Sequence, residues 1–61
     1  GPAMTSTVKV TAHCAATKVV EIVVSDGGKT EVILLQDGET KELYVYDARN
    51  VTVCERLVAD E

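Results

Sequence analysis

The sequence predicts an all-β protein, namely a small five-stranded antiparallel meander that forms a sandwich or a partly open barrel. The aliphatic side chains are those of eleven valines, four leucines and two isoleucines, and the branched valine side chain suits a pleated sheet better than a helix. Short β-rich runs alternate with turn signals at a spacing of roughly 8–12 residues, which is typical of small sandwiches and barrels. No window longer than about ten residues keeps the period of an amphipathic helix.

Five strands follow from the alternation of apolar and polar residues and from the turns between them. The predicted strands span residues 7–14, 18–25, 30–35, 40–46 and 51–57. Asp26-Gly27-Gly28-Lys29 and Asp37-Gly38 are predicted hairpin turns, because Asp-Gly and Gly-Gly supply the positive φ that primed turns require. Asp47 to Asn50 forms a further turn. Ala15-Ala16-Thr17 also has to turn the chain, although it contains none of the usual turn residues.

A chain of 61 residues is long enough for one small domain. Gly1-Pro2-Ala3 resembles the remnant of a cleaved expression tag, so residues 4–61 are predicted to form the domain. A domain of this size buries only about 60% of the surface that its unfolded chain exposes. Association between chains would therefore add burial that a single copy lacks.

Ten acidic and six basic residues give the chain a net charge of −4. The basic residues are scattered along the sequence, whereas proteins that bind a phosphate backbone cluster Lys and Arg. No nucleic-acid partner is therefore expected. The sequence also lacks the run of about 20 apolar residues that crosses a bilayer, so no membrane partner is expected.

The middle strands carry apolar residues on both faces, whereas an antiparallel sheet normally has one apolar and one polar face. So short a chain has difficulty covering both sets, and tyrosine is enriched at protein interfaces. The predicted interface residues are Val19, Val23, Val32, Leu34, Tyr44 and Tyr46. They predict a homo-oligomer, with a twofold dimer as the default. The alternatives are a strongly curled barrel that buries the middle of both faces by itself, or tyrosine rings that merely shield the sheet.

His13, Cys14 and Cys54 are the candidates for a metal site, but they are too few and wrongly spaced for structural zinc. Adjacent residues of a strand point to opposite faces, so His13 and Cys14 also make a poor nucleophile pair. A Cys14–Cys54 disulfide would require the first and last strands to be neighbours, and two reduced thiols are the favoured state. We therefore expect no catalytic residue, no metal and no cofactor.

Three short motifs follow one another in a fixed order in the second half of the chain. Leu35-Gln36-Asp37-Gly38-Glu39-Thr40 is followed by Tyr44-Val45-Tyr46-Asp47-Ala48-Arg49 and by Val51-Thr52-Val53-Cys54-Glu55. In this order the sequence resembles small uncharacterised β-rich accessory proteins of tailed bacteriophages, mainly over residues 32–55. The resemblance implies a viral accessory or virion-associated protein, located in the host cytoplasm or the virion, with no catalytic residues to carry over.

The expected function is that of a non-enzymatic binding module, which acts by surface contact with itself or with a host protein. Two alternatives remain open. One is a virion structural protein, such as a decoration or cement protein. The other is an oligomeric sponge whose small-ligand pockets form between subunits.

Overall fold

The computed structural model describes residues 5–58, and these residues form five antiparallel strands and no helix. The strands are β1 (Ser6–Thr11), β2 (Lys18–Asp26), β3 (Lys29–Leu35), β4 (Thr40–Val45) and β5 (Asn50–Leu57). The all-β prediction is therefore confirmed. The expected tag remnant, Gly1-Pro2-Ala3, lies outside the described residues, as do residues 59–61.

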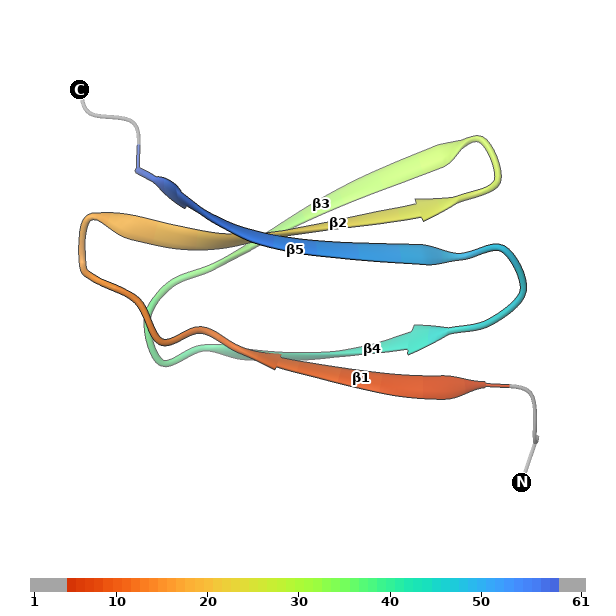
Figure 1. Ribbon diagram of the computed structural model, residues 1–61, viewed down its shortest axis with the longest axis horizontal. Helices are drawn as coiled ribbons and strands as arrows, with labels where there is room; N and C mark the ends of the chain where they lie inside the picture. Colours follow the sequence, from red (N-terminus) through yellow and green to blue (C-terminus); the bar gives the residue numbers. More distant parts are fainter. Residues whose placement is uncertain (1–4, 59–61) are drawn as a thin grey trace.

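The strands form two sheets that face each other as an open sandwich (Figure 1). One sheet has two strands in the order β1-β4, and the other has three in the order β3-β2-β5. Neither sheet closes on the other through strand pairing. The open sandwich is thus the form that the chain adopts, rather than a closed barrel.

The connections between strands differ from those of a simple meander. Only β2 and β3 form a hairpin, while β3 and β4 belong to different sheets and do not pair. The Asp37-Gly38 turn therefore carries the chain from one sheet to the other instead of closing a hairpin. Its backbone bonds to the end of the first strand, where Gly38 N–H donates to the Ala12 carbonyl over 2.9 Å and Ala12 N–H donates to the Glu39 carbonyl over 2.8 Å. The regular ladder is broken here, because Gly38 rather than Glu39 donates to Ala12, while Glu39 N–H donates to the Gln36 carbonyl over 2.9 Å; β1 therefore ends at Thr11, earlier than the alternation predicts.

The β2–β3 hairpin has the primed turn that the sequence predicts. Asp26 pairs with Lys29, so that only two glycines form the loop. Gly27 has a φ of +66°, whereas Gly28 is not in the positive region. A positive φ at the first central residue alone is the signature of a type II′ turn.

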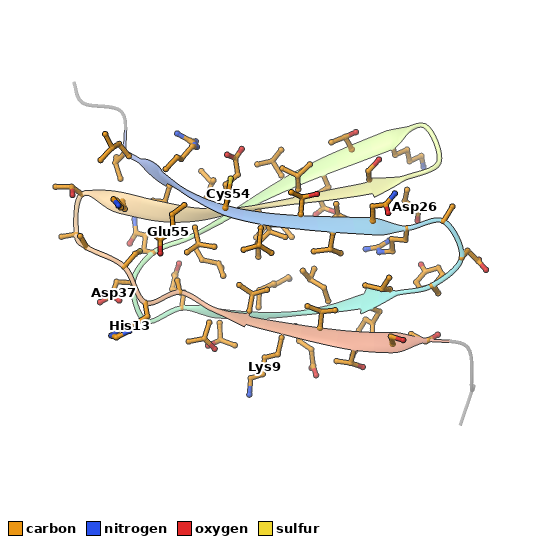
Figure 2. The ribbon with its side chains drawn as sticks, in the orientation of Figure 1. Lys9, His13, Asp26, Asp37, Cys54 and Glu55 are labelled. Atoms are coloured by element: carbon orange, nitrogen blue, oxygen red, sulfur yellow. The ribbon has the colours of Figure 1, made fainter. Side chains whose placement is uncertain are left out.

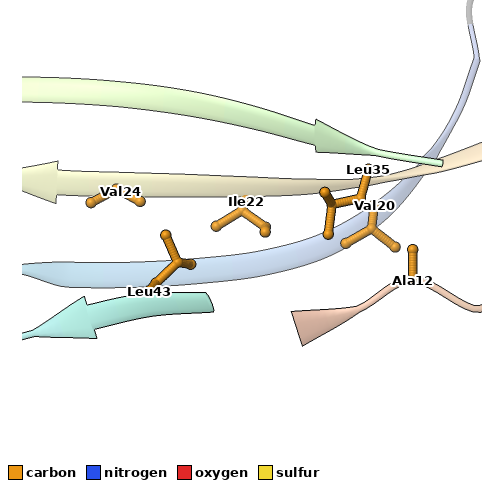
Figure 3. Packing of buried hydrophobic residues seen from close by; sticks show 6 residues of the cluster. All are labelled: Ala12, Val20, Ile22, Val24, Leu35 and Leu43. Atoms are coloured by element: carbon orange, nitrogen blue, oxygen red, sulfur yellow. The ribbon is translucent and has the colours of Figure 1, made fainter. Parts of the chain in front are cut away.

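The core lies between the sheets and is small (Figure 3). Its buried residues are Ala12, Val20, Ile22, Val24, Leu35 and Leu43. Ile22 is fully buried at the centre of β2, which is the middle strand of the larger sheet. Leu43 extends from the opposite sheet, so β4 is held against β2 by side-chain packing. Each fully buried aliphatic side chain contributes about 1.5–3 kcal/mol.

Candidate protein interface

The three-stranded sheet has a second face, turned away from β1 and β4, which we call the outer face. Side chains alternate along each strand, and residues paired across strands share a face. The register therefore defines the members of this face. The outer face consists of Val19, Glu21, Val23 and Ser25 of β2, Thr30, Val32 and Leu34 of β3, and Asn50, Thr52, Cys54 and Arg56 of β5. Figure 2 shows Cys54 on this side of the sheet.

The apolar part of the outer face lies along β3. Val32 is 53% exposed and Leu34 is 48% exposed, although both are large aliphatic residues. Val23 of β2 is half-buried and lies directly opposite Val32. On the other side of Val23 the sheet becomes polar, since its partner in β5 is Thr52. On the outer face, the exposed aliphatic side chains are therefore concentrated at the β3 edge of the sheet, whereas Val53 and Leu57 of β5 are exposed on the other face.

The ionisable side chains of the outer face neutralise each other. Arg56 Nε donates to Glu21 Oε1 over 3.1 Å, and the two residues come from neighbouring strands. Cys54 Sγ lies 4.0 Å from the same carboxylate oxygen. The outer face thus has no net charge, whereas the whole chain has a net charge of −4. A second copy facing this surface would meet less repulsion than it would elsewhere.

The structure brings only part of the predicted interface set together. Val23, Val32 and Leu34 lie on the outer face as expected, but Val19 is only 8% exposed and cannot contribute contact area. Tyr44 is 52% exposed on the far side of the other sheet, beside Thr7. The reason is the sheet crossing between β3 and β4, which separates faces that a meander would make continuous.

Tyr46 has a structural role that the sequence did not reveal. The guanidinium carbon of Arg49 lies 5.4 Å from the centre of the Tyr46 ring, in the range of a cation–π contact. Arg49 Nη1 also donates to Asp26 Oδ2 over 3.1 Å. Arg49 thus ties the β4–β5 connection to the end of the β2–β3 hairpin. The predicted turn at Asp47 was the only local signal, and Asp47 does have a φ of +54°.

The two cysteines are free thiols that lie on different sides of the larger sheet. Cys54 is exposed on the outer face, whereas Cys14 is half-buried and packs against the core. Cys14 Sγ donates to the Lys18 carbonyl over 3.5 Å. Partial burial, together with the carboxylates of Glu55 and Asp37, raises the pKa of the Cys14 thiol. A raised pKa disfavours the thiolate that a nucleophile or a metal ligand needs.

The described part of the chain shows little that suits a metal or a small ligand. Within residues 5–58, no three His, Cys, Asp or Glu side chains converge on one point. A shallow hollow of about 250 Å³ is lined by Ala15, Ala16, Lys18, Val19, Gln36, Asp37 and Val58. Ligand sites in proteins typically enclose roughly 300–1,000 Å³. No helix among the described residues is long and apolar enough to span a membrane.

The chain matches no protein-family model, no curated protein and no solved structure.

Proposed function

We propose that this protein is a non-enzymatic protein-binding module that self-associates through the apolar part of its outer face, with a twofold dimer as the default. The observation that carries the proposal is the exposure of Val32 and Leu34 on the face of the sheet that is turned away from the buried core. Two large aliphatic side chains that a small core leaves in water favour burial against another surface.

The size of the molecule supports a partner that covers one sheet. A stable interface buries about 800 Å² per partner, which is about a fifth of the 4442 Å² that this chain exposes. The outer face offers an apolar strip beside a neutral polar region, an arrangement similar to the apolar core and polar rim of stable interfaces. The same face on a second copy is the partner most readily available, because a twofold axis pairs identical surfaces.

The biological setting that we propose is that of a bacteriophage accessory protein, in the host cytoplasm or the virion. Its support is the motif order over residues 32–55, which includes the exposed β3 residues. A host protein could occupy the outer face in place of a second copy. A virion structural role is the alternative, and it predicts that the protein co-purifies with intact particles.

Sedimentation equilibrium of the purified chain tests the proposal, with Leu34→Lys as the disrupting variant. We expect the unmodified protein to be dimeric at micromolar concentration and Leu34→Lys to be monomeric, because a desolvated lysine opposes burial. Thr52→Lys is the matched control, since it places the same charge on the polar side of the same face and should leave the dimer intact. A monomer at every concentration for the unmodified chain contradicts self-association.

A further inference from the structure

We propose that two copies associate by pairing β3 of one with β3 of the other in antiparallel fashion, so that their three-stranded sheets become one six-stranded sheet. This inference rests on the proposed function and specifies how the second copy is bound. It identifies the edge of the sheet, rather than stacking of the two outer faces, as the primary contact. Strand addition of this kind obtains affinity from backbone hydrogen bonds and specificity from alternating side chains.

The backbone of β3 has unused hydrogen-bonding groups at its free edge. A two-residue hairpin closes on a hydrogen-bonded pair, here Asp26 with Lys29. Alternation then directs the backbone groups of residues 29, 31, 33 and 35 towards β2. The groups of Thr30, Val32 and Leu34 point away from the sheet. The hydrogen bond from Val58 N–H to the Thr17 carbonyl, over 2.8 Å, supports the same alternation independently. It indicates that the backbone groups of the odd-numbered residues of β2 bond to β5, so those of the even-numbered residues bond to β3.

Among the open strand edges of the described residues, only that of β3 has no ionisable side chain at the positions whose backbone groups point outward. The outward-bonding residues of β3 are Thr30, Val32 and Leu34, none of which is ionisable. By the same alternation, the open edge of β5 contains Glu55, and those of β1 and β4 contain Lys9 and Glu42. Proteins use charged residues at sheet edges to prevent pairing with another chain. The outward-bonding residues of β3 lack this protection, although Lys29 and Glu31 of the same strand are charged, and the strand contains no proline.

A register centred on Ile33 suits two copies best. It places Val32 of each copy opposite Leu34 of the other, so that the two most exposed aliphatic residues of the strand cover each other. Glu31 of each copy lies opposite Leu35 of the other, so the two Glu31 side chains do not face each other. This register also brings Lys29 of each copy towards the end of β3 that leads to Asp37 of the other, so opposite charges meet at both ends. The pairing is thus complementary in polarity and in charge.

Proline substitution separates edge pairing from face stacking. Val32→Pro removes an N–H that points to the open edge and therefore breaks no hydrogen bond to β2. Val53→Pro is the matched control, because Val53 occupies the equivalent outward position on the free edge of β5. We expect the dissociation constant of the dimer to rise by about tenfold or more for Val32→Pro, and by less than about twofold for Val53→Pro. Leu34→Pro repeats the test if Val32→Pro does not fold, as judged by circular dichroism.

The outcomes distinguish this inference from the proposed function. A dimer that survives both proline substitutions in β3 overturns edge pairing and leaves association through stacked faces. Loss of the dimer in Val53→Pro alone assigns pairing to β5 and also overturns the inference. An unmodified chain that is always monomeric removes the proposed self-association itself.

Cross-linking tests the register. Val32→Cys and Leu34→Cys are prepared separately on a Cys14→Ser, Cys54→Ser background, mixed and oxidised. Opposed residues of a hydrogen-bonded pair have Cα atoms about 5.5 Å apart, which suits a disulfide. We expect the mixed Val32→Cys–Leu34→Cys product to exceed either homodimeric product, as measured by intact mass. Predominance of the Val32→Cys homodimer, or absence of cross-links in a dimeric mixture, contradicts the proposed register.

Discussion

Single side chains differ widely in what they contribute to this small fold. Ile22 is fully buried in the core, while Val53, its partner across the β2–β5 pair, is 47% exposed although both face the same side of the sheet. The difference arises because β5 is an edge strand, where solvent reaches side chains that point inward. The loss of unfolding free energy when such a side chain is shortened to alanine is therefore decided by its position within the sheet and not by its residue type.

Ile22→Ala should destabilise the protein by about 2–5 kcal/mol, because it removes buried methylene groups and leaves a cavity at the centre of the core. Val53→Ala should cost less than about 1 kcal/mol, since water already contacts that side chain. Urea unfolding followed by circular dichroism measures both values. Equal costs for the two variants would contradict the described core.

Arg49→Met should destabilise the fold by about 1 kcal/mol, because it removes the cation–π contact with Tyr46 and the ion pair with Asp26. Thermal unfolding at low salt measures this loss. Arg49→Lys is the informative control: a lysine keeps the charge but lacks the planar guanidinium, so it should restore only part of the stability. Full recovery by lysine would show that the planar contact with Tyr46 is unimportant.

The Cys14 thiol makes stability depend on pH in the alkaline range. Because its pKa is raised in the folded state, the fold favours the protonated thiol. This contribution is complete below the pKa of the unfolded chain and is lost as pH rises through the folded pKa. Above about pH 8.5, the ordinary pKa of a cysteine thiol, the unfolding free energy of the unmodified protein should therefore fall more steeply than that of Cys14→Ser. Parallel pH profiles would contradict a raised pKa.

At the scale of elements, the two turns predicted as hairpins have similar chemistry but different roles. Gly27 and Gly38 both have positive φ, +66° and +91° respectively. The first joins two paired strands, whereas the second sends the chain to the opposite sheet. A turn sequence determines the local backbone conformation, but the partner of the following strand depends on which faces need to be covered.

Gly27→Ala should destabilise the β2–β3 hairpin by about 1–2 kcal/mol, because an L-residue is strained at a φ of +66°. Gly28→Ala is a close control: it lies one residue away, has no positive φ and meets no atom within 4 Å of the added carbon. It should be nearly neutral. Chemical denaturation of both variants measures the difference, and equal effects would contradict a type II′ turn.

For the whole molecule, a small core and an exposed aliphatic strip have the same origin. Five short strands in two sheets provide one interior, and the second apolar face of β3 has no third layer to cover it. If a second copy covers part of these side chains, folding and association become linked through mass action.

The melting temperature of the unmodified chain should therefore rise with protein concentration, while that of Leu34→Lys should not. Differential scanning calorimetry over a range of about a hundredfold in concentration measures this dependence. The comparison is informative because both chains have the same core residues. A melting temperature that is independent of concentration in the unmodified chain would contradict self-association.

Much of the fold was predictable because its signals are local. The bounds of β2, β3, β4 and β5 lie within one residue of those predicted, since alternation and turn residues act over a few positions. The first strand was predicted to reach Cys14 but ends at Thr11, because the distant Gly38, and not Glu39, donates to the Ala12 carbonyl and so breaks the regular ladder. A hydrogen bond to a residue far along the chain cannot be predicted from the residues next to it in the sequence.

The candidate interface was predictable only in part, for a related reason. The sequence by itself determined the fold class, the primed turn at Gly27 and the presence of more aliphatic residues than one sheet face can hold. Only the tertiary structure decided that Val32 and Leu34 stay exposed together while Val19 is buried and the two tyrosines lie elsewhere. Alternation predicts on which side of its own strand a residue lies. Whether that side is buried or exposed depends on the order of the strands in the sheets, which is determined by contacts between residues far apart in the chain.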